Sequence, residues 1–176
     1  MTVATDYPEV YIASLAAYNN AILYGTWIVL DGMDADDIQA EVTEMLKGCP
    51  EHGEEWAIHD HSGFAGIRVS EYESWETLIA WAAGIAEHGE AFAAWVRNDP
   101  SNEDPELFGR QFKGEFADVG EYAQDYWEQC NENLENLIGD LAYHIDWDSY
   151  GEDFTNDLTV LDAPGGRVFI FDTSED

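Results

Sequence analysis

The sequence is short of basic residues. Only six Lys and Arg stand against 38 Asp and Glu in 176 residues, which gives a formal net charge of −32 at pH 7. A surface with so few cations repels the phosphates of nucleic acids and the headgroups of anionic membranes. The composition therefore argues against direct binding of nucleic acid or of a membrane, and it predicts a basic partner.

Cysteine and long apolar runs are also scarce. The two cysteines, Cys49 and Cys130, are too few to staple a domain of this size. No apolar run approaches the roughly 18 residues of a membrane span, and no basic and apolar leader opens the chain. We therefore expect a soluble, cytoplasmic protein with reduced thiols.

Catalytic signatures are missing as well. The sequence contains no GxSxG, P-loop or GxGxxG motif. Pairs of carboxylates for acid–base chemistry carry no information, because 38 acids provide such pairs everywhere. The sequence thus predicts no catalytic residue, no enzymatic activity and no cofactor.

Aromatic residues, by contrast, are abundant. The chain holds seven Trp, nine Tyr and eight Phe within a 45% apolar composition. High net charge favours disorder because self-repulsion opposes compaction, but a solvated tail does not need this aromatic content. We expect a folded α+β protein with a heavily acidic exterior.

The first third of the sequence predicts a small α+β unit. Two β-rich runs, residues 10–18 and 22–30, are expected to form neighbouring strands, and residues 56–61 a third short strand. Between them a helix should begin at the N-cap Asp34 and end at Gly48. Its apolar spacing gives one buried face, made by Ile38, Val42, Met45 and Leu46.

The middle of the sequence predicts a helical hairpin. One helix should follow the N-cap Ser74 and run to His88, and a second should cover residues 90–98. The residues at buried spacing are Leu78, Trp81, Ala82 and Ile85 in the first helix, then Phe92 and Trp95 or Val96 in the second. Residues 100–105, which begin and end with proline, form the clearest linker.

The last third combines helices with a hairpin. Apolar residues at spacings of three or four predict one buried stripe along a long helix or two helices in line: Ala123, Trp127, Cys130, Leu134, Leu137 and Leu141. A short helix to about residue 156 and two strands at 158–161 and 167–171 should close the chain. We expect three units in all, 1–61 (mixed α/β), 62–105 (helical) and 106–176 (α+β).

A row of acids follows another face of the long helical segment: Asp118, Glu121, Asp125, Glu128, Glu132 and Glu135. The row spans roughly 25 Å with no Lys or Arg between its members. Like charges at this spacing each cost about 0.2–0.5 kcal/mol, and a solubility face would mix signs. Two explanations are open: adaptation to a salt-rich cytoplasm, or imitation of a polyanion.

The amount of charge favours an elongated body. B-DNA carries one charge per about 1.7 Å, so a charge of −32 corresponds to roughly 54 Å of duplex. A compact sphere of this length has a diameter of only about 40 Å. Three small units in series would match the charge density of DNA better.

Four side chains form an alternative metal-binding hypothesis. Cys49, His52, His59 and His61 are all possible zinc ligands, although their spacing matches no common zinc motif. A metal-binding module and a salt-adapted interaction protein therefore stay as alternatives to a polyanion mimic.

One segment carries a family resemblance. YIASLAAYNNAILYGTWIVLD, residues 11–31, resembles the opening of the ArdA antirestriction proteins, whose pattern is like YxASLAxYNxGxLxGxW. Ala21 stands where that family usually has Gly. GIAEHGEAFAAW (84–95), YHIDWDSYGEDFTNDL (143–158) and VFIFD (168–172) extend the resemblance, with Trp147 in place of a usual Tyr.

The resemblance implies a DNA mimic. It implies an elongated, curved dimer of three small units, whose carboxylates are placed like the phosphates of bent B-DNA. Such proteins are carried by plasmids, conjugative transposons and phages, and act in the bacterial cytoplasm. They occupy the DNA groove of type I restriction-modification enzymes and protect incoming DNA from cleavage and modification.

The hypothesis assigns two sets of residues. The phosphate-mimicking candidates are acids on the expected helices or beside them: Asp34, Asp37, Glu41, Glu44, Glu73, Glu76, Glu87, Glu90, Asp118, Glu121, Asp125, Glu128, Glu132 and Glu135. The candidates for the dimer contact are apolar residues near the C-terminal region: Leu137, Leu141, Ile145 and Trp147.

Overall fold

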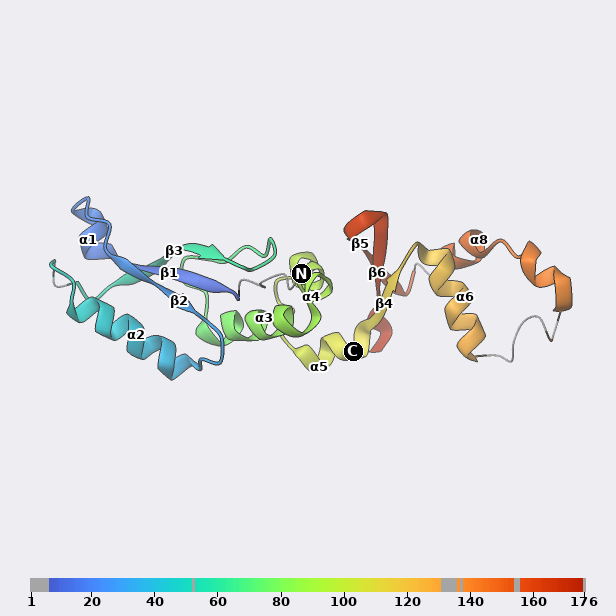
Figure 1. The fold of residues 1–176 in the computed structure, drawn as a ribbon, viewed down its shortest axis with the longest axis horizontal. Helices are drawn as coiled ribbons and strands as arrows, with labels where there is room; N and C mark the ends of the chain where they lie inside the picture. Colours follow the sequence, from blue (N-terminus) through green and yellow to red (C-terminus); the bar gives the residue numbers. More distant parts are fainter. Residues whose placement is uncertain (1–6, 52, 131–135, 137, 154–155, 176) are drawn as a thin grey trace, which may run out of the picture. The chain divides into compact units, whose positions relative to one another are not determined.

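The computed structural model is an α+β protein that forms two compact units, Met1–Glu103 and Asp104–Asp176. It describes residues 7–51, 53–130, 136, 138–153 and 156–175. Within these residues each unit contains one three-stranded antiparallel sheet (Figure 1). The boundary between the units lies inside the expected linker, whereas the further division after residue 61 stays a prediction.

The sheet of the first unit has β1 (Glu9–Ser14) at its centre. β2 (Gly25–Val29) and β3 (Trp56–Ser62) pair with it on either side, which confirms the two neighbouring strands and the third short strand. Val10, Ile12 and Ile28 are buried. The sheet therefore supplies one wall of this unit's core.

The first strand is shorter than the prediction. Residues 15–18 are not strand but part of α1 (Leu15–Asn19), because the Ser14 side chain accepts a hydrogen bond from the Ala17 N–H at 3.4 Å and caps that helix. Serine competes for backbone donors in this way and so favours helix starts over strand interiors. The second strand likewise begins at Gly25 and not at residue 22.

Helix α2 (Ala35–Lys47) forms as predicted and lies along β2 (Figure 1). Asp34 and Asp37 build a capping box, in which each side chain accepts from the other residue's backbone N–H, and Gly48 is the C-cap. The expected buried face is confirmed for Ile38 and Val42, which are fully buried, and for Met45, which is nearly so; Leu46 is only half-buried.

The predicted helical hairpin consists of α3 (Trp75–His88) and α4 (Glu90–Asn98). Ser74 caps α3, and Gly89, at φ +61°, separates the two helices. The Phe92 ring lies where a side chain at Gly84 would have to be, so the helices approach closely at that glycine. Trp81, Phe92, Trp95 and Val96 are all buried.

The second unit is built on a sheet of order β4-β6-β5. The predicted hairpin is present as β5 (Leu158–Ala163), the short turn η2 (Pro164–Gly166) and β6 (Arg167–Asp172). The sequence did not predict α5 (Pro105–Gln111) or β4 (Phe112–Phe116). Together these elements bring Phe108, Phe112, Phe169 and Phe171 into one aromatic core.

The prediction of one long buried stripe in the last third of the chain is wrong beyond its first residues. Helix α6 (Val119–Cys130) buries Ala123, but Cys130 is exposed and Leu141 is 65% exposed. Leu134 and Leu137 lie outside the described residues. Gly139, at φ +58°, begins a 3-10 turn, η1 (Gly139–His144), because the left-handed conformation does not continue an α-helix.

Two elements complete the second unit. Helix α8 (Trp147–Glu152) packs against α6, and η3 (Thr173–Glu175) follows the last strand. No helix in the described parts of the chain has the length and apolar character that crossing a membrane requires.

Candidate acidic binding surface

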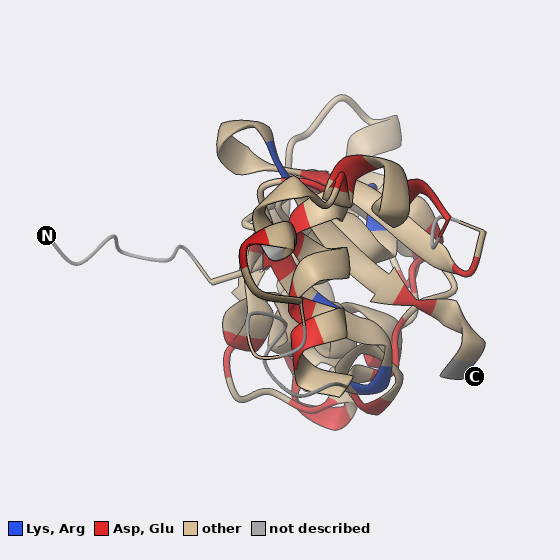
Figure 2. Ribbon diagram, turned by 90° about the vertical axis from the view of Figure 1, so that its right-hand side faces the viewer, with Lys and Arg blue, Asp and Glu red and all other residues tan. Residues whose placement is uncertain are grey.

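Acidic side chains are distributed over the elements of both units. Figure 2 shows Asp and Glu on helices, strands and loops, and Lys and Arg at only a few places. Of the fourteen candidate acids, those in the described residues are exposed apart from Glu73, which is half-buried. Exposure leaves their charge available to a partner, but their local contacts differ.

On α2 the candidates divide into capping and free residues. The carboxylates of Asp34 and Asp37 form the capping box. The Asp34 carboxylate accepts the Asp37 N–H at 2.9 Å, and the Asp37 carboxylate accepts the Asp34 N–H at 3.3 Å. Glu44 forms an ion pair of 3.0 Å with Lys47. Glu41 has none of these local contacts and is exposed.

The central candidates flank α3 and α4. Glu76 lies in the first turn of α3, and Glu87 lies 3.9 Å from the His88 ring nitrogen. Glu90, in the first turn of α4, forms an ion pair of 2.6 Å with Arg97. Arg97 also donates to the carbonyl of Ala65, so Glu90 is partly neutralised by a cation that has a structural contact of its own.

The predicted spacing places four of the candidate acids on α6 or just before it. Asp118 precedes the helix and accepts the Glu121 N–H at 2.8 Å, which caps its first turn. Asp125 and Glu128 are exposed and accept from the neutral amides of Gln129 at 2.6 Å and Gln124 at 2.9 Å, so neither of these partners offsets their charge. Glu132 and Glu135 lie outside the described residues.

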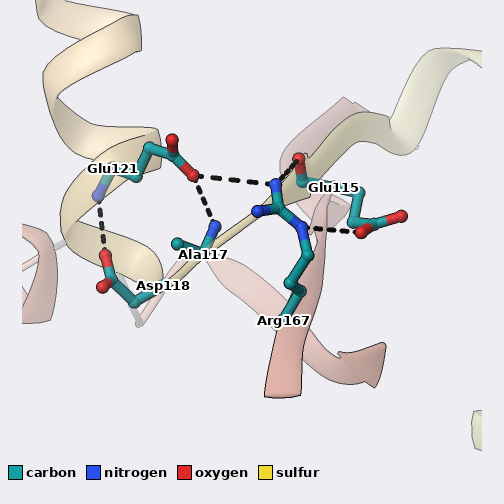
Figure 3. A network of polar contacts seen from close by, with 5 residues as sticks. All are labelled: Glu115, Ala117, Asp118, Glu121 and Arg167. Carbon is teal, nitrogen blue, oxygen red and sulfur yellow. Dashed lines mark hydrogen bonds and ion pairs between the residues drawn. The ribbon is translucent and has the colours of Figure 1, made fainter. Parts of the chain in front are cut away.

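The first turn of α6 has a cationic partner that the sequence reasoning missed. Arg167, at the start of β6, lies between Glu115 of β4 and Glu121 of α6 (Figure 3). Its Nε donates to Glu115 Oε1 at 2.7 Å, and its Nη2 lies 3.8 Å from Glu121 Oε2. Only the pairing of β4 with β6 brings Arg167 near these residues, so no local pattern could have found it.

Tyr122 and Asp172, in the same unit, have pKa values shifted from their ordinary ones. Burial, reinforced by the charge of Asp172, raises the pKa of Tyr122 to about 12. A hydrogen bond from the Ser174 hydroxyl lowers the pKa of Asp172. Tyr122 therefore stays neutral and Asp172 stays charged at neutral pH.

The metal-binding alternative receives no support from the described part of the chain, which contains no group of three or more possible ligands. Cys49 is buried and its Sγ lies 3.3 Å from the Ser14 hydroxyl. His59 packs edge-on against Tyr18, and His61 against Phe64. His52, the fourth member of the group, lies outside the described residues.

The expected dimer residues lie in an exposed apolar segment. Leu141 is 65% exposed, and Ile145 and Trp147 are half-buried; Leu137 lies outside the described residues. The structure adds Ile138 and Tyr143, which are 39% and 75% exposed in the same segment and which the sequence reasoning did not name.

The segment of residues 11–31 has a clear structural basis for its motif. Ser14 caps α1, and Gly25 faces the carbonyl oxygen of Ile12 so closely that no β-carbon fits. Ala21 has φ +59°, the left-handed region that glycine occupies most easily. The motif thus encodes the turn from β1 through α1 into β2.

A protein-family model matches this chain. The family model described as "Antirestriction protein (ArdA)" matches residues 10–169, which is nearly the whole chain and both of its units. A search of curated proteins found no match. Because the family model spans both units, the chain belongs to the ArdA family of antirestriction proteins.

Proposed function

We propose that this protein is a DNA mimic that occupies the DNA-binding groove of type I restriction-modification enzymes. By excluding DNA it would inhibit both cleavage and modification, and so protect the incoming DNA of a mobile genetic element. It needs no catalytic group and no cofactor, because inhibition comes from binding alone.

The observation that carries this proposal is the exposed charge on the helices of a protein of formal charge −32. A groove that neutralises DNA phosphates with Lys and Arg would gain the same Coulomb attraction and counterion release from carboxylates. The family membership supports an antirestriction role. Together they favour competition for the DNA site over a separate inhibitory site.

Local contacts rank the candidate acids. Asp125, Glu128 and Glu41 have no cationic neighbour among the contacts described above and offer their full charge. Glu44, Glu90 and Glu121 share theirs with Lys47, Arg97 and Arg167. We therefore expect the first group to contribute more to partner binding than the second.

We also propose a homodimer that forms through the segment containing Leu141 and Tyr143. Both side chains are largely exposed, and large exposed apolar residues close together in one segment are typical of an interface. Sedimentation at micromolar concentration should give twice the monomer mass, and a monomer would contradict this part of the proposal.

A displacement experiment tests the function directly. A type I restriction enzyme is bound to labelled DNA that carries its site, and the protein is added at increasing concentration. We expect stoichiometric release of DNA, with an apparent affinity that falls steeply as salt rises. If DNA stays bound at saturating protein, the competitive mechanism is wrong.

Salt also separates this proposal from the salt-adapted alternative. A protein that owes its acidic surface to a salt-rich cytoplasm should unfold when salt is removed. A DNA mimic should stay folded at low salt while its binding becomes tighter. Circular dichroism and the displacement experiment, both at low salt, distinguish the two.

A further inference from the structure

One of the few cations in the chain lies at the base of the acidic face of α6. Arg167 donates through Nε to the Glu115 carboxylate at 2.7 Å and through Nη2 to the Glu115 carbonyl at 3.1 Å. The same Nη2 lies 3.8 Å from the Glu121 carboxylate. The guanidinium therefore joins strand β4 to the first turn of α6 from its position on β6 (Figure 3).

The helix side of this network is fixed as well. The Glu121 carboxylate also accepts the Ala117 N–H, and the Asp118 carboxylate accepts the Glu121 N–H at 2.8 Å. Each carboxylate is held by a backbone group of the junction between β4 and α6. The first turn of α6 is thus tied to the sheet at several points.

We propose that Arg167 is a positioning residue: it sets the orientation of α6 on the sheet and thereby aims Asp125 and Glu128 at the cations of the partner. This inference rests on the proposed function and names the residue that gives the acidic surface its geometry. Glu128 lies about 10 Å along the helix axis from Glu121, so a tilt of about 10° would move it by about 2 Å. Such a shift is enough to misplace a carboxylate that stands in for a phosphate.

Charge and stability alone do not explain an arginine at this place. Arg167 cancels one negative charge in a protein whose proposed partner is basic, so on Coulomb grounds its loss should tighten binding. Its side chain and those of Glu115 and Glu121 are 41%, 44% and 53% exposed, and ion pairs this exposed add little to stability. The planar fork, which can engage two groups in fixed directions, explains the choice of Arg.

The test compares two variants of equal charge. Arg167→Gln and Arg110→Gln each change the formal net charge from −32 to −33. Arg110 lies on α5 in the same unit, its side chain is exposed, and it has no ion pair within the described residues. The dissociation constant for the type I enzyme is measured for both at several salt concentrations.

We expect Arg167→Gln to weaken binding about tenfold despite its extra negative charge, and Arg110→Gln to bind as tightly as the unchanged protein or slightly tighter. We also expect the dissociation constant of Arg167→Gln to depend less on salt. The slope of its logarithm against log salt should fall by about the contribution of one charge contact, because misplaced carboxylates no longer release counterions on binding. A loss of folded protein alone would not change this slope.

A third variant protects the test against misfolding. Arg167→Lys keeps the charge at −32 but replaces the fork by a single ammonium, so we expect weaker binding in the same direction. Thermal unfolding confirms that each variant is folded at the assay temperature. If Arg167→Gln binds as tightly as Arg110→Gln, the positioning role is wrong and the proposed function stands. Where the Gln variant unfolds, the same conclusion follows if Arg167→Lys binds as tightly as the unchanged protein, which has the same charge. If the unchanged protein does not bind the enzyme, the proposed function fails, and the inference with it.

Discussion

Gly151 of α8 lies directly against the backbone of Val119 in α6. A β-carbon on Gly151 would stand 2.8 Å from the Val119 carbonyl oxygen and 3.1 Å from the Gly120 nitrogen. Gly120 in turn faces the Asp148 side chain with no room for a β-carbon. The two glycines allow α6 and α8 to touch through their backbones, so α8 supports the helix that carries Asp125 and Glu128.

The first prediction concerns this contact. Gly151→Ala should destabilise the protein by about 1–3 kcal/mol, because the obstructing atoms belong to the backbone and cannot rotate away. Intrinsic helix propensity predicts the opposite sign, a gain of up to about 1 kcal/mol. Denaturant unfolding followed by circular dichroism measures the difference.

The matched control is Gly109→Ala on α5 in the same unit. Apart from its chain neighbours and the backbone of its own helix, no atom lies within 4 Å of the β-carbon position there, so this change should stabilise by about 0.5–1 kcal/mol. Equal effects of the two substitutions would show that α6 and α8 do not meet at Gly151.

The second prediction concerns the turn after α1. Ala21 has φ +59°, where a β-carbon costs about 1–2 kcal/mol, and its backbone N–H donates to the Tyr18 carbonyl at 2.9 Å. Ala21→Gly removes this strain but makes the unfolded chain more flexible, so the net gain should be about 0.5–1 kcal/mol. Ala86→Gly, at an exposed position in α3, should instead destabilise by a similar amount.

The elements that could be predicted from sequence are those whose signals are local. Helix α2 is capped by Asp34 at its start and by Gly48 at its end and buries residues at helical spacing, and each signal lies within the helix or beside it. The hairpin of β5 and β6 is similarly marked by Pro164 and its two following glycines. Such elements need no distant partner to be specified.

The elements that were missed depend on distant residues. Strand β4 contains Gly114, at φ +133°, and an irregular register where it meets β6, so no alternating pattern marks it. The apolar stripe failed for a related reason: α6 is buried only where α8 and the sheet cover its first turns, and periodicity does not show how far that cover extends. Arg167 acts across 52 residues of sequence to reach Glu115.

The third prediction is a pH dependence in the second unit. Tyr122 has its pKa raised to about 12 in the folded protein, mainly by burial, whereas an unfolded tyrosine titrates near about 10. Its contribution to stability is therefore complete below pH 10 and is lost as the pH rises toward 12. The free energy of unfolding should fall over this range.

Tyr122→Phe isolates that contribution. The difference in unfolding free energy between the unchanged protein and this variant should be constant from pH 7 to 9 and should shrink between pH 10 and 12, because the other tyrosines cancel in the difference. A difference that stays constant to pH 12 would mean that Tyr122 is not shielded from solvent in the folded state.

The fourth prediction tests whether binding is shared among many carboxylates. Replacing any one of Asp125, Glu128, Glu132 or Glu135 by its amide should weaken binding to the type I enzyme by no more than about threefold, since one exposed charge contributes little alone. Replacing all four should weaken binding by about 100-fold or more. It should also reduce the slope of log K against log salt by the contribution of several charge contacts. The control replaces Glu54 and Glu55, which are exposed in the segment before β3 and are not among the candidate acids.

If a single amide substitution abolished inhibition while the protein stayed folded, a local binding site would have to replace the distributed mimic. Because the four-residue variant keeps a net charge of −28, its failure to bind would also show that the placement of the acids matters beyond their number.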